Sequence, residues 1–208
     1  MTGHEGQRMA VNGRDRQPAM NAGSAARAAT AATAAAMAPS APAPSPRLAG
    51  LPPVLARHTR CIVLGSFPGV ASLAVQQYYG HPRNHFWPLL SAIWGIDLVA
   101  LPYRQRLSEV RWRGLGIWDA YASCERVGSL DTAIEAAQLN DFAALRRRAP
   151  GLALALHNGS ESARAASALQ ALGLATRRLP STSPANASWS FERKLAAWRA
   201  AFAEGGIV

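Results

Sequence analysis

Residues 61–69 have the sequence Cys-Ile-Val-Leu-Gly-Ser-Phe-Pro-Gly, and this stretch decides the fold class. Its first four residues are all apolar and include the β-branched Ile62 and Val63, a pattern typical of a strand buried on both faces. The following residues, 65–69, combine glycine and proline, which favour a turn. A buried strand that runs directly into a turn predicts the first parallel strand of an α/β domain.

Similar patterns recur along the rest of the chain. Further strands are predicted at 115–121, 152–156 and 175–179. Helical spacing of apolar residues and capping side chains predict helices at 84–94, 141–148, 160–172 and 190–202. This alternation predicts a single three-layer α/β/α domain around a central, mostly parallel four-stranded sheet. Ligands in such folds bind beyond the carboxyl ends of the strands.

Composition divides the chain after residue 47. Residues 1–47 contain 15 alanines and no Leu, Ile, Phe, Trp, Tyr or Cys, so they bury too little apolar surface to offset their ordering entropy. We therefore expect a disordered Ala/Pro-rich tail at 1–47, followed by one domain at 48–208. We expect a cytoplasmic, nucleoid-associated protein, although an acid-poor leader with arginine and serine leaves organelle targeting open.

The charge balance favours a polyanionic partner. The chain has 22 Lys and Arg against 12 Asp and Glu, a formal net charge of +10. Such a balance favours nucleic acid before an anionic membrane. No apolar run approaches the roughly 18 residues of a membrane span, which excludes that class. Cys61 and Cys124 are too few for a disulfide framework or a cysteine-rich metal site, and no histidine pair has metal-ligand spacing. We expect no metal and no cofactor.

Four polar segments lie near the predicted strand ends. They are Gly-Ser-Phe-Pro-Gly at 65–69, Tyr-Tyr-Gly-His-Pro-Arg-Asn-His-Phe-Trp at 78–87, Asn-Gly at 158–159 and Pro-Ser-Thr-Ser-Pro-Ala-Asn at 180–186. In their order and spacing they resemble the uracil-DNA glycosylase superfamily, specifically its hypoxanthine-DNA (deoxyinosine) glycosylase branch. The resemblance covers about 60–203.

This resemblance implies a monofunctional base-excision repair enzyme. Such an enzyme extrudes a damaged nucleotide from DNA and hydrolyses its N-glycosidic bond, here with hypoxanthine as the base and also uracil. Extrusion costs a few kcal/mol and is cheapest at a mispair. The implied partner is DNA that contains deaminated bases, and we expect a monomer without a membrane partner.

The resemblance also assigns residues to the base. Gly65, Ser66 and Phe67 belong to a turn whose backbone approaches the base closely because glycine leaves space. Tyr79 corresponds to the aromatic residue that stacks on the extruded base. Asn158 corresponds to the asparagine that reads the base edge, where one amide satisfies the adjacent C=O and N–H of hypoxanthine or uracil. Each of these residues also has a purely structural interpretation, as a turn or a core side chain.

Two residues are assigned to catalysis. Asn84 matches the asparagine that this branch uses, where other branches carry a carboxylate in the first motif; an amide positions water rather than acting as a strong base. Its structural alternative is a helix N-cap. Ser181 occupies the place of a catalytic histidine in the best-known branch, so we expect weaker electrostatic help to the leaving base.

The last loop and its flank are assigned to DNA. The residues concerned are Arg178, Thr182, Ser183, Ala185 and Asn186, whose hydroxyls and guanidinium suit phosphate oxygens. Ala185 lies where other branches place a bulky side chain that fills the vacated stack. The alanine therefore argues against strong wedge insertion at this position.

Three other functions stay open at this stage. They are a uracil- or mismatch-specific glycosylase, a non-catalytic nucleic-acid-binding module on the same fold, and a nucleoside hydrolase. We expect the last to require carboxylates at the strand ends, and the loops above contain none. Lys194, the single lysine, lies in the last predicted helix and away from these loops, which argues against Schiff-base chemistry.

Overall fold

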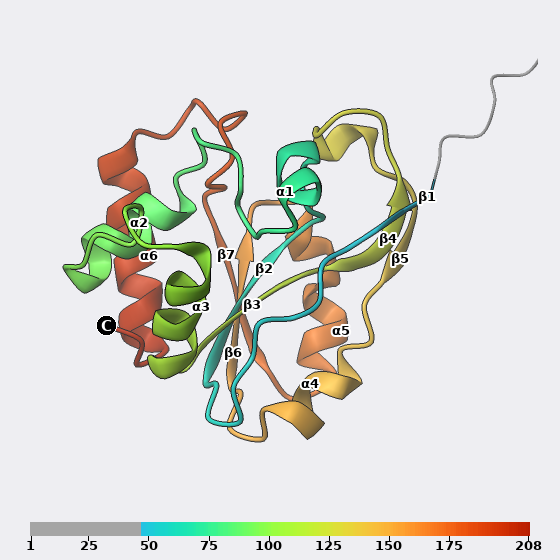
Figure 1. Ribbon diagram of the computed structural model, residues 1–208. Helices are drawn as coiled ribbons and strands as arrows, with labels where there is room; N and C mark the ends of the chain where they lie inside the picture. Colours follow the sequence, from blue (N-terminus) through green and yellow to red (C-terminus); the bar gives the residue numbers. More distant parts are fainter. Residues whose placement is uncertain (1–46) are drawn as a thin grey trace, which may run out of the picture. The chain divides into compact units, whose positions relative to one another are not determined.

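Four parallel strands form the central sheet of the computed structural model, which describes residues 47–208 (Figure 1). Their order in space is β3 (Leu115–Asp119), β2 (Cys61–Gly65), β6 (Leu154–Asn158) and β7 (Ala175–Leu179). Every residue of β2, β3 and β6 is buried, including the polar residues Asp119, His157 and Asn158 at the ends of β3 and β6. The tail predicted at 1–47 lies outside the described residues, apart from Arg47.

The pairing of β2 creates the crevice at the top of the sheet. This strand pairs in parallel with β3 on one side and β6 on the other, with Gly65 opposite Asp119 and Leu64 opposite His157. The chain therefore leaves β2 toward one edge of the sheet and later returns toward the other. Such a reversal opens a crevice beyond the carboxyl ends of the two central strands.

Helices cover both faces of this sheet (Figure 1). One face carries α2 (Phe86–Trp94), α3 (Tyr103–Trp112) and α6 (Phe191–Glu204), and the other carries α4 (Ala143–Arg148), the 3₁₀ turn η2 (Ser162–Ala165) and α5 (Ala166–Gln170). The short α1 (Val70–Val75) follows the turn after β2. The three-layer architecture with a parallel four-stranded sheet is thus confirmed. No helix within residues 47–208 has the length and apolar character of a membrane span.

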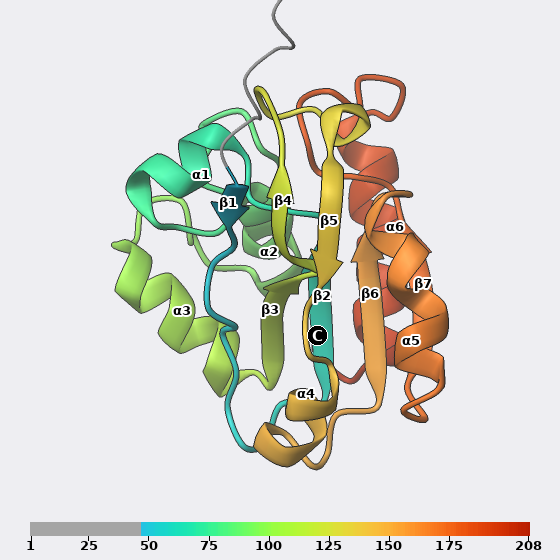
Figure 2. The ribbon, with the colours of Figure 1, turned by 90° about the vertical axis from the view of Figure 1, so that its right-hand side faces the viewer.

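A second, antiparallel sheet was not predicted. It consists of β1 (Arg47–Ala49), β4 (Tyr121–Glu125) and β5 (Glu135–Leu139), with the 3₁₀ turn η1 (Asp131–Ala133) between the last two (Figure 2). The strand predicted at 115–121 was wrong at its end, because β3 stops at Asp119 and the chain turns into β4. All residues of β5 are exposed, so the sequence has no apolar alternation there.

Other differences concern helices. Both α1 and α3 were missed, and the helix predicted at 160–172 is divided into η2 and α5. The remaining predicted helices are present with ends shifted by a few residues.

Two tryptophans provide a matched test of this core. Trp198 on α6 is fully buried, packs edge-on against Phe86 with ring centroids 5.9 Å apart, and donates from Nε1 to the Pro180 carbonyl at 3.0 Å. We expect Trp198→Ala to lower the free energy of unfolding by about 3–5 kcal/mol in chemical denaturation. Trp112 is 72% exposed, so Trp112→Ala should change it by less than about 0.5 kcal/mol. Equal losses of unfolding free energy in the two variants would contradict this packing.

Candidate active site

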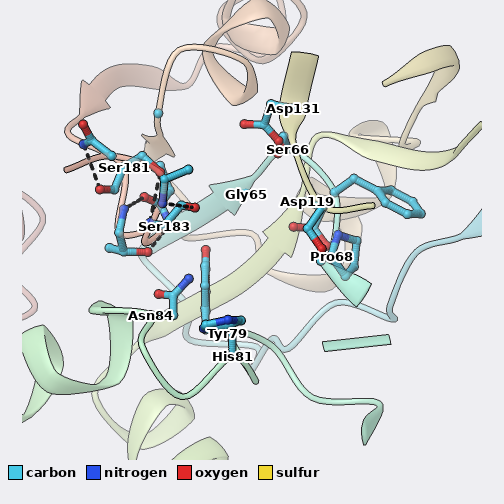
Figure 3. A pocket seen from close by; sticks show the side chains of 18 of the residues that line it. Gly65, Ser66, Pro68, Tyr79, His81, Asn84, Asp119, Asp131, Ser181 and Ser183 are labelled. Atoms are coloured by element: carbon cyan, nitrogen blue, oxygen red, sulfur yellow. Dashed lines mark hydrogen bonds between the residues drawn. The ribbon is translucent and has the colours of Figure 1, made fainter. Parts of the chain in front are cut away.

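One cavity of about 690 Å³ opens at the carboxyl ends of the parallel strands. All the site residues predicted from the sequence line it: Gly65, Ser66, Phe67, Tyr79, Asn84, Asn158, Arg178, Ser181, Thr182, Ser183, Ala185 and Asn186. Figure 3 shows Asp119 and Asp131 on one side of this cavity and Ser181 and Ser183 on the other, with Tyr79 and Asn84 along a third wall.

The loop after β7 is clamped to the end of β6. The Asn158 amide donates from Nδ2 to Thr182 Oγ1 at 2.9 Å and accepts at Oδ1 from the Thr182 backbone N–H at 2.8 Å. Thr182 is completely buried, and its carbonyl accepts from the His85 N–H at 3.0 Å. This corrects the expectation that Thr182 contacts DNA, because its hydroxyl and both of its backbone groups hold the loop in place.

The same clamp uses half of the capacity of Asn158. A side-chain amide has two N–H donors and an oxygen with two lone pairs. Thr182 takes one donor and one lone pair, so one of each is left for a ligand in the cavity. The predicted base-reading asparagine is therefore also a structural residue, held in a fixed orientation.

Close approach of two loops explains the glycine after Asn158. Gly159 has a φ of +108°, and a Cβ placed there would lie 3.2 Å from Ser181 Cβ. The Ser181 hydroxyl oxygen accepts from the Ser183 N–H at 3.2 Å, while its carbonyl accepts from Asn186 Nδ2 at 3.0 Å. The Ser181 O–H has no acceptor among the described residues, so it is a donor available to the cavity.

Lys194 lies closer to this loop than we predicted. Its side chain is buried, and Nζ donates to the Asn186 carbonyl at 2.9 Å. The expectation that Lys194 is remote from the loops is therefore wrong, although it is not among the residues that line the cavity. Burial lowers the pKa of this amine. Its geometry indicates a support for the loop from behind.

Tyr79 presents a ring and a hydroxyl in different environments. The ring is half-buried and stacks on Phe86, with centroids 3.8 Å apart and planes at 22°. Its backbone has a φ of +55°, a conformation that is costly for a bulky residue. The hydroxyl is buried and has no hydrogen-bond partner within residues 47–208. Burial and the nearby Asp119 raise its pKa, against a weaker opposing effect of the Asn158 amide. A strained, supported aromatic ring beside a cavity suits stacking on a planar ligand.

Asn84 is both at the cavity and at the start of α2. Its Oδ1 accepts from the Phe86 N–H at 2.9 Å, so the side chain binds the first N–H of the helix from the position before the N-cap, which is His85 rather than Asn84 as predicted. The capping interaction leaves its Nδ2 group without a partner among the described residues. The structural and the catalytic interpretations are thus compatible, because capping orients the amide.

Two carboxyl groups at this cavity were missed. Asp119 ends β3, and Asp131 comes from the turn between β4 and β5. Ser66 Oγ donates to Asp131 Oδ1 at 2.5 Å. A Cβ on Gly65 would overlap Asp119 Oδ1, so the glycine makes room for this carboxyl. The expectation that the strand ends lack carboxylates is therefore wrong.

Asp119 is the more unusual of the two. It is 3% exposed, and its Oδ2 is buried with no hydrogen-bond partner in the described part of the chain. Burial raises the pKa of this carboxyl to about 8, a rise that the Arg126 guanidinium opposes and Asp131 reinforces. The group is therefore mainly neutral at pH 7, and a neutral carboxyl is a hydrogen-bond donor.

The rim of the cavity, unlike its inner wall, is formed by exposed side chains. Arg178 and Ala185 are exposed there, as is Leu130, whose side chain is 58% accessible. Arg126 lies behind the rim, with its guanidinium 5.1 Å from the centre of the Phe67 ring. Leu130 was missed because it stands in a loop with no recognisable pattern.

The site combines amides and hydroxyls with two carboxyl groups, those of Asp119 and Asp131, and has Arg178 at its rim. Within residues 47–208 no group of three or more His, Cys, Asp or Glu could hold a metal ion. Such a site can bind a planar heterocycle, orient water and donate protons.

Comparisons with known proteins identify the family to which this chain belongs. No protein-family model matches the chain. A protein named hypoxanthine DNA glycosylase from Methanosarcina barkeri is 40% identical over 153 residues, which are 74% of this chain and 96% of that one. A protein of the same name from Methanosarcina acetivorans is 36% identical over the same shares of both chains.

A solved structure agrees with these relatives. It is a solution NMR structure from Methanosarcina acetivorans of a protein provisionally named a uracil DNA glycosylase. The two structures superpose with a TM-score of 0.69 at 34% identity, over 76% of this chain and 98% of that one. The identity and coverage of these relatives show that the chain belongs to the hypoxanthine DNA glycosylases of the uracil-DNA glycosylase superfamily.

Proposed function

We propose that this protein is a monofunctional DNA glycosylase that removes hypoxanthine, and also uracil, from DNA. It hydrolyses the N-glycosidic bond and leaves an intact strand with an abasic site. It acts as a monomer on cellular DNA, in the cytoplasm at the nucleoid. The observation that carries the proposal is the convergence of a supported aromatic ring, Tyr79, and two oriented amides, Asn84 and Asn158, on one cavity.

The remaining hydrogen-bonding capacity of Asn158 fits the edge of a deaminated base. Hypoxanthine and uracil each present a C=O next to an N–H, which match one amide donor and one amide lone pair. Adenine and cytosine present an amino donor in place of the C=O and leave the amide N–H unpaired, which costs roughly 1–3 kcal/mol. Because Thr182 fixes the orientation of the amide, Asn158 has no freedom to rotate toward the wrong base.

Synthetic DNA separates this function from the alternatives. Oligonucleotides with a single inosine, uracil or xanthine are incubated with the protein and then treated with alkali. Breaks that appear only after alkali, first at inosine, support the proposed function. Binding of the DNA without breaks would indicate a nucleic-acid-binding module. Breaks at uracil alone would indicate a uracil-specific enzyme. Cleavage of free nucleosides would indicate a nucleoside hydrolase.

Asn84 provides the first test of mechanism. We expect Asn84→Ala to lower the single-turnover rate about 100-fold or more, because the water loses its orientation, while binding to DNA with an abasic analogue changes little. Loss of the cap should also cost about 1 kcal/mol of stability. Asn84→Asp keeps the cap, and its carboxylate should keep measurable activity that rises with pH as it ionises.

A loss of stability without a loss of excision rate would contradict the catalytic role of Asn84. An alanine variant that melts at a lower temperature yet excises at the normal rate would assign Asn84 to helix capping alone.

Lys194 tests whether the enzyme is monofunctional. Its Nζ bonds the Asn186 carbonyl and does not line the cavity, so we expect no covalent adduct when borohydride is added during the reaction. Gel shift under denaturing conditions measures the adduct. Its appearance with the natural chain, and its absence with Lys194→Gln, would show that the lysine forms a Schiff base.

Leu130 tests how the vacated stack is filled. The residue is exposed at the rim of the cavity, and Ala185 in the loop after β7 is too small to fill the gap left by a base. Apolar side chains of this kind insert between base steps. We expect Leu130→Ala to slow excision from duplex DNA about tenfold with little change on single strands. Val99→Ala, equally apolar, exposed and outside the cavity, is the control; equal slowing on single strands would contradict the wedge role.

A further inference from the structure

The inner wall of the cavity contains a buried carboxyl group without an assigned task. Asp119 Oδ2 has no hydrogen-bond partner among the described residues, and Oδ1 is directed at the space that a side chain on Gly65 would fill. The Tyr79 hydroxyl, also buried without a partner, lies against the same glycine, 3.7 Å from that Cβ position. Buried polar groups are normally paired, so two unpaired polar atoms at one wall point to a polar ligand.

We propose that Asp119 is the general acid for the departing purine: its carboxyl donates a proton to N7 of the extruded hypoxanthine as the C1′–N9 bond breaks. This inference rests on the proposed function and names the group that makes a purine a competent leaving group. Ring N7 is the most basic ring nitrogen of inosine, and its protonation removes the negative charge that would otherwise develop on the base.

The step is balanced in protons and electrons. The electron pair of the C1′–N9 bond moves into the purine ring, and the Asp119 proton on N7 yields neutral hypoxanthine. Water, oriented by the Asn84 amide, adds its oxygen to C1′ and releases one proton to solvent. Asp119 then recovers a proton from solvent before the next turnover. No oxidant, metal or further reactant is needed.

Burial, rather than the charges around it, favours the neutral form of Asp119. The groups that face it are the Arg126 guanidinium, which directly follows β4, the Asp131 carboxyl from η1, and the hydroxyls of Tyr78, Tyr79 and Tyr103. Arg126 is the cation here, and its guanidinium donates to the Pro68 carbonyl and faces Phe67 rather than pairing with Asp119. Burial raises the pKa of Asp119 to about 8, so the proton is present at neutral pH.

A comparison of substrates tests the proton transfer. Asp119→Asn preserves shape but has no acidic proton, and we expect it to slow excision of inosine in single-turnover assays about 100-fold. The natural chain should already excise 7-deazainosine slowly, because this analogue lacks N7. Asp119→Asn should slow excision of the analogue only a little further. Asp141→Asn, an exposed aspartate outside the cavity, is the matched control and should excise at the normal rate.

The dependence of activity on pH tests whether Asp119 acts as an acid or as a base. Activity of the natural chain should fall as pH rises through about 8, because the acid loses its proton, and Asp119→Asn should lack this fall. A rate that instead rises with pH in this range would assign Asp119 as a base. If Asp119→Asn lowered the excision rates of inosine and 7-deazainosine by the same factor, Asp119 would be a structural residue. Either result overturns the proposal.

Two readouts are independent of activity. Infrared spectra at pH 7 should contain a protonated-carboxyl C=O band that Asp119→Asn lacks; an ionised Asp119 would overturn the proposal even in an active enzyme. The raised pKa also means that the folded state holds an extra proton between about pH 4 and 8. The stability of the natural chain should therefore decline as pH rises through this window. The decline should be smaller in the Asp119→Asn variant. Absence of excision by the natural chain would refute the proposed function instead.

Discussion

The parallel pairing of β2 with both β3 and β6 is the constraint on which the site depends. It sets Gly65 beside Asp119 and brings the end of β6, with Asn158, to the same edge of the sheet. Gly65 has no side chain, and the Asp119 carboxyl occupies the space where one would be. A register shift of one residue in either pair would reverse which side chains face the cavity. The site thus follows from strand register before any loop is considered.

The loops add orientation to this edge. Asn158 holds Thr182, Thr182 holds the start of α2 through His85, and Lys194 holds the Asn186 carbonyl from behind. These bonds connect three elements that are far apart in the chain. Their common consequence is that the groups facing the cavity are held in place before a ligand arrives, which is the condition under which hydrogen bonds contribute most to catalysis.

The sequence predicted the parallel sheet because buried strands such as β2 are uninterrupted apolar runs, and it predicted the cavity because short polar segments follow them. It did not reveal β5, whose residues are all exposed and lack alternation. The carboxyl of Asp119 was overlooked because its importance lies in its register opposite Gly65, a long-range relation. The burial of Lys194 contradicts the usual exposure of lysine and depends on the path of the loop above it.

We propose that an extruded purine lies between Tyr79 and Asn158 with N7 toward Asp119. The most direct measurement is a crystal structure of the protein bound to duplex DNA that contains 2′-fluoroarabino-inosine, whose glycosidic bond resists cleavage. We expect hypoxanthine in the cavity, with N7 within hydrogen-bond distance of the Asp119 carboxyl. A base that stays stacked in the duplex, or enters with N7 directed away from Asp119, would contradict it.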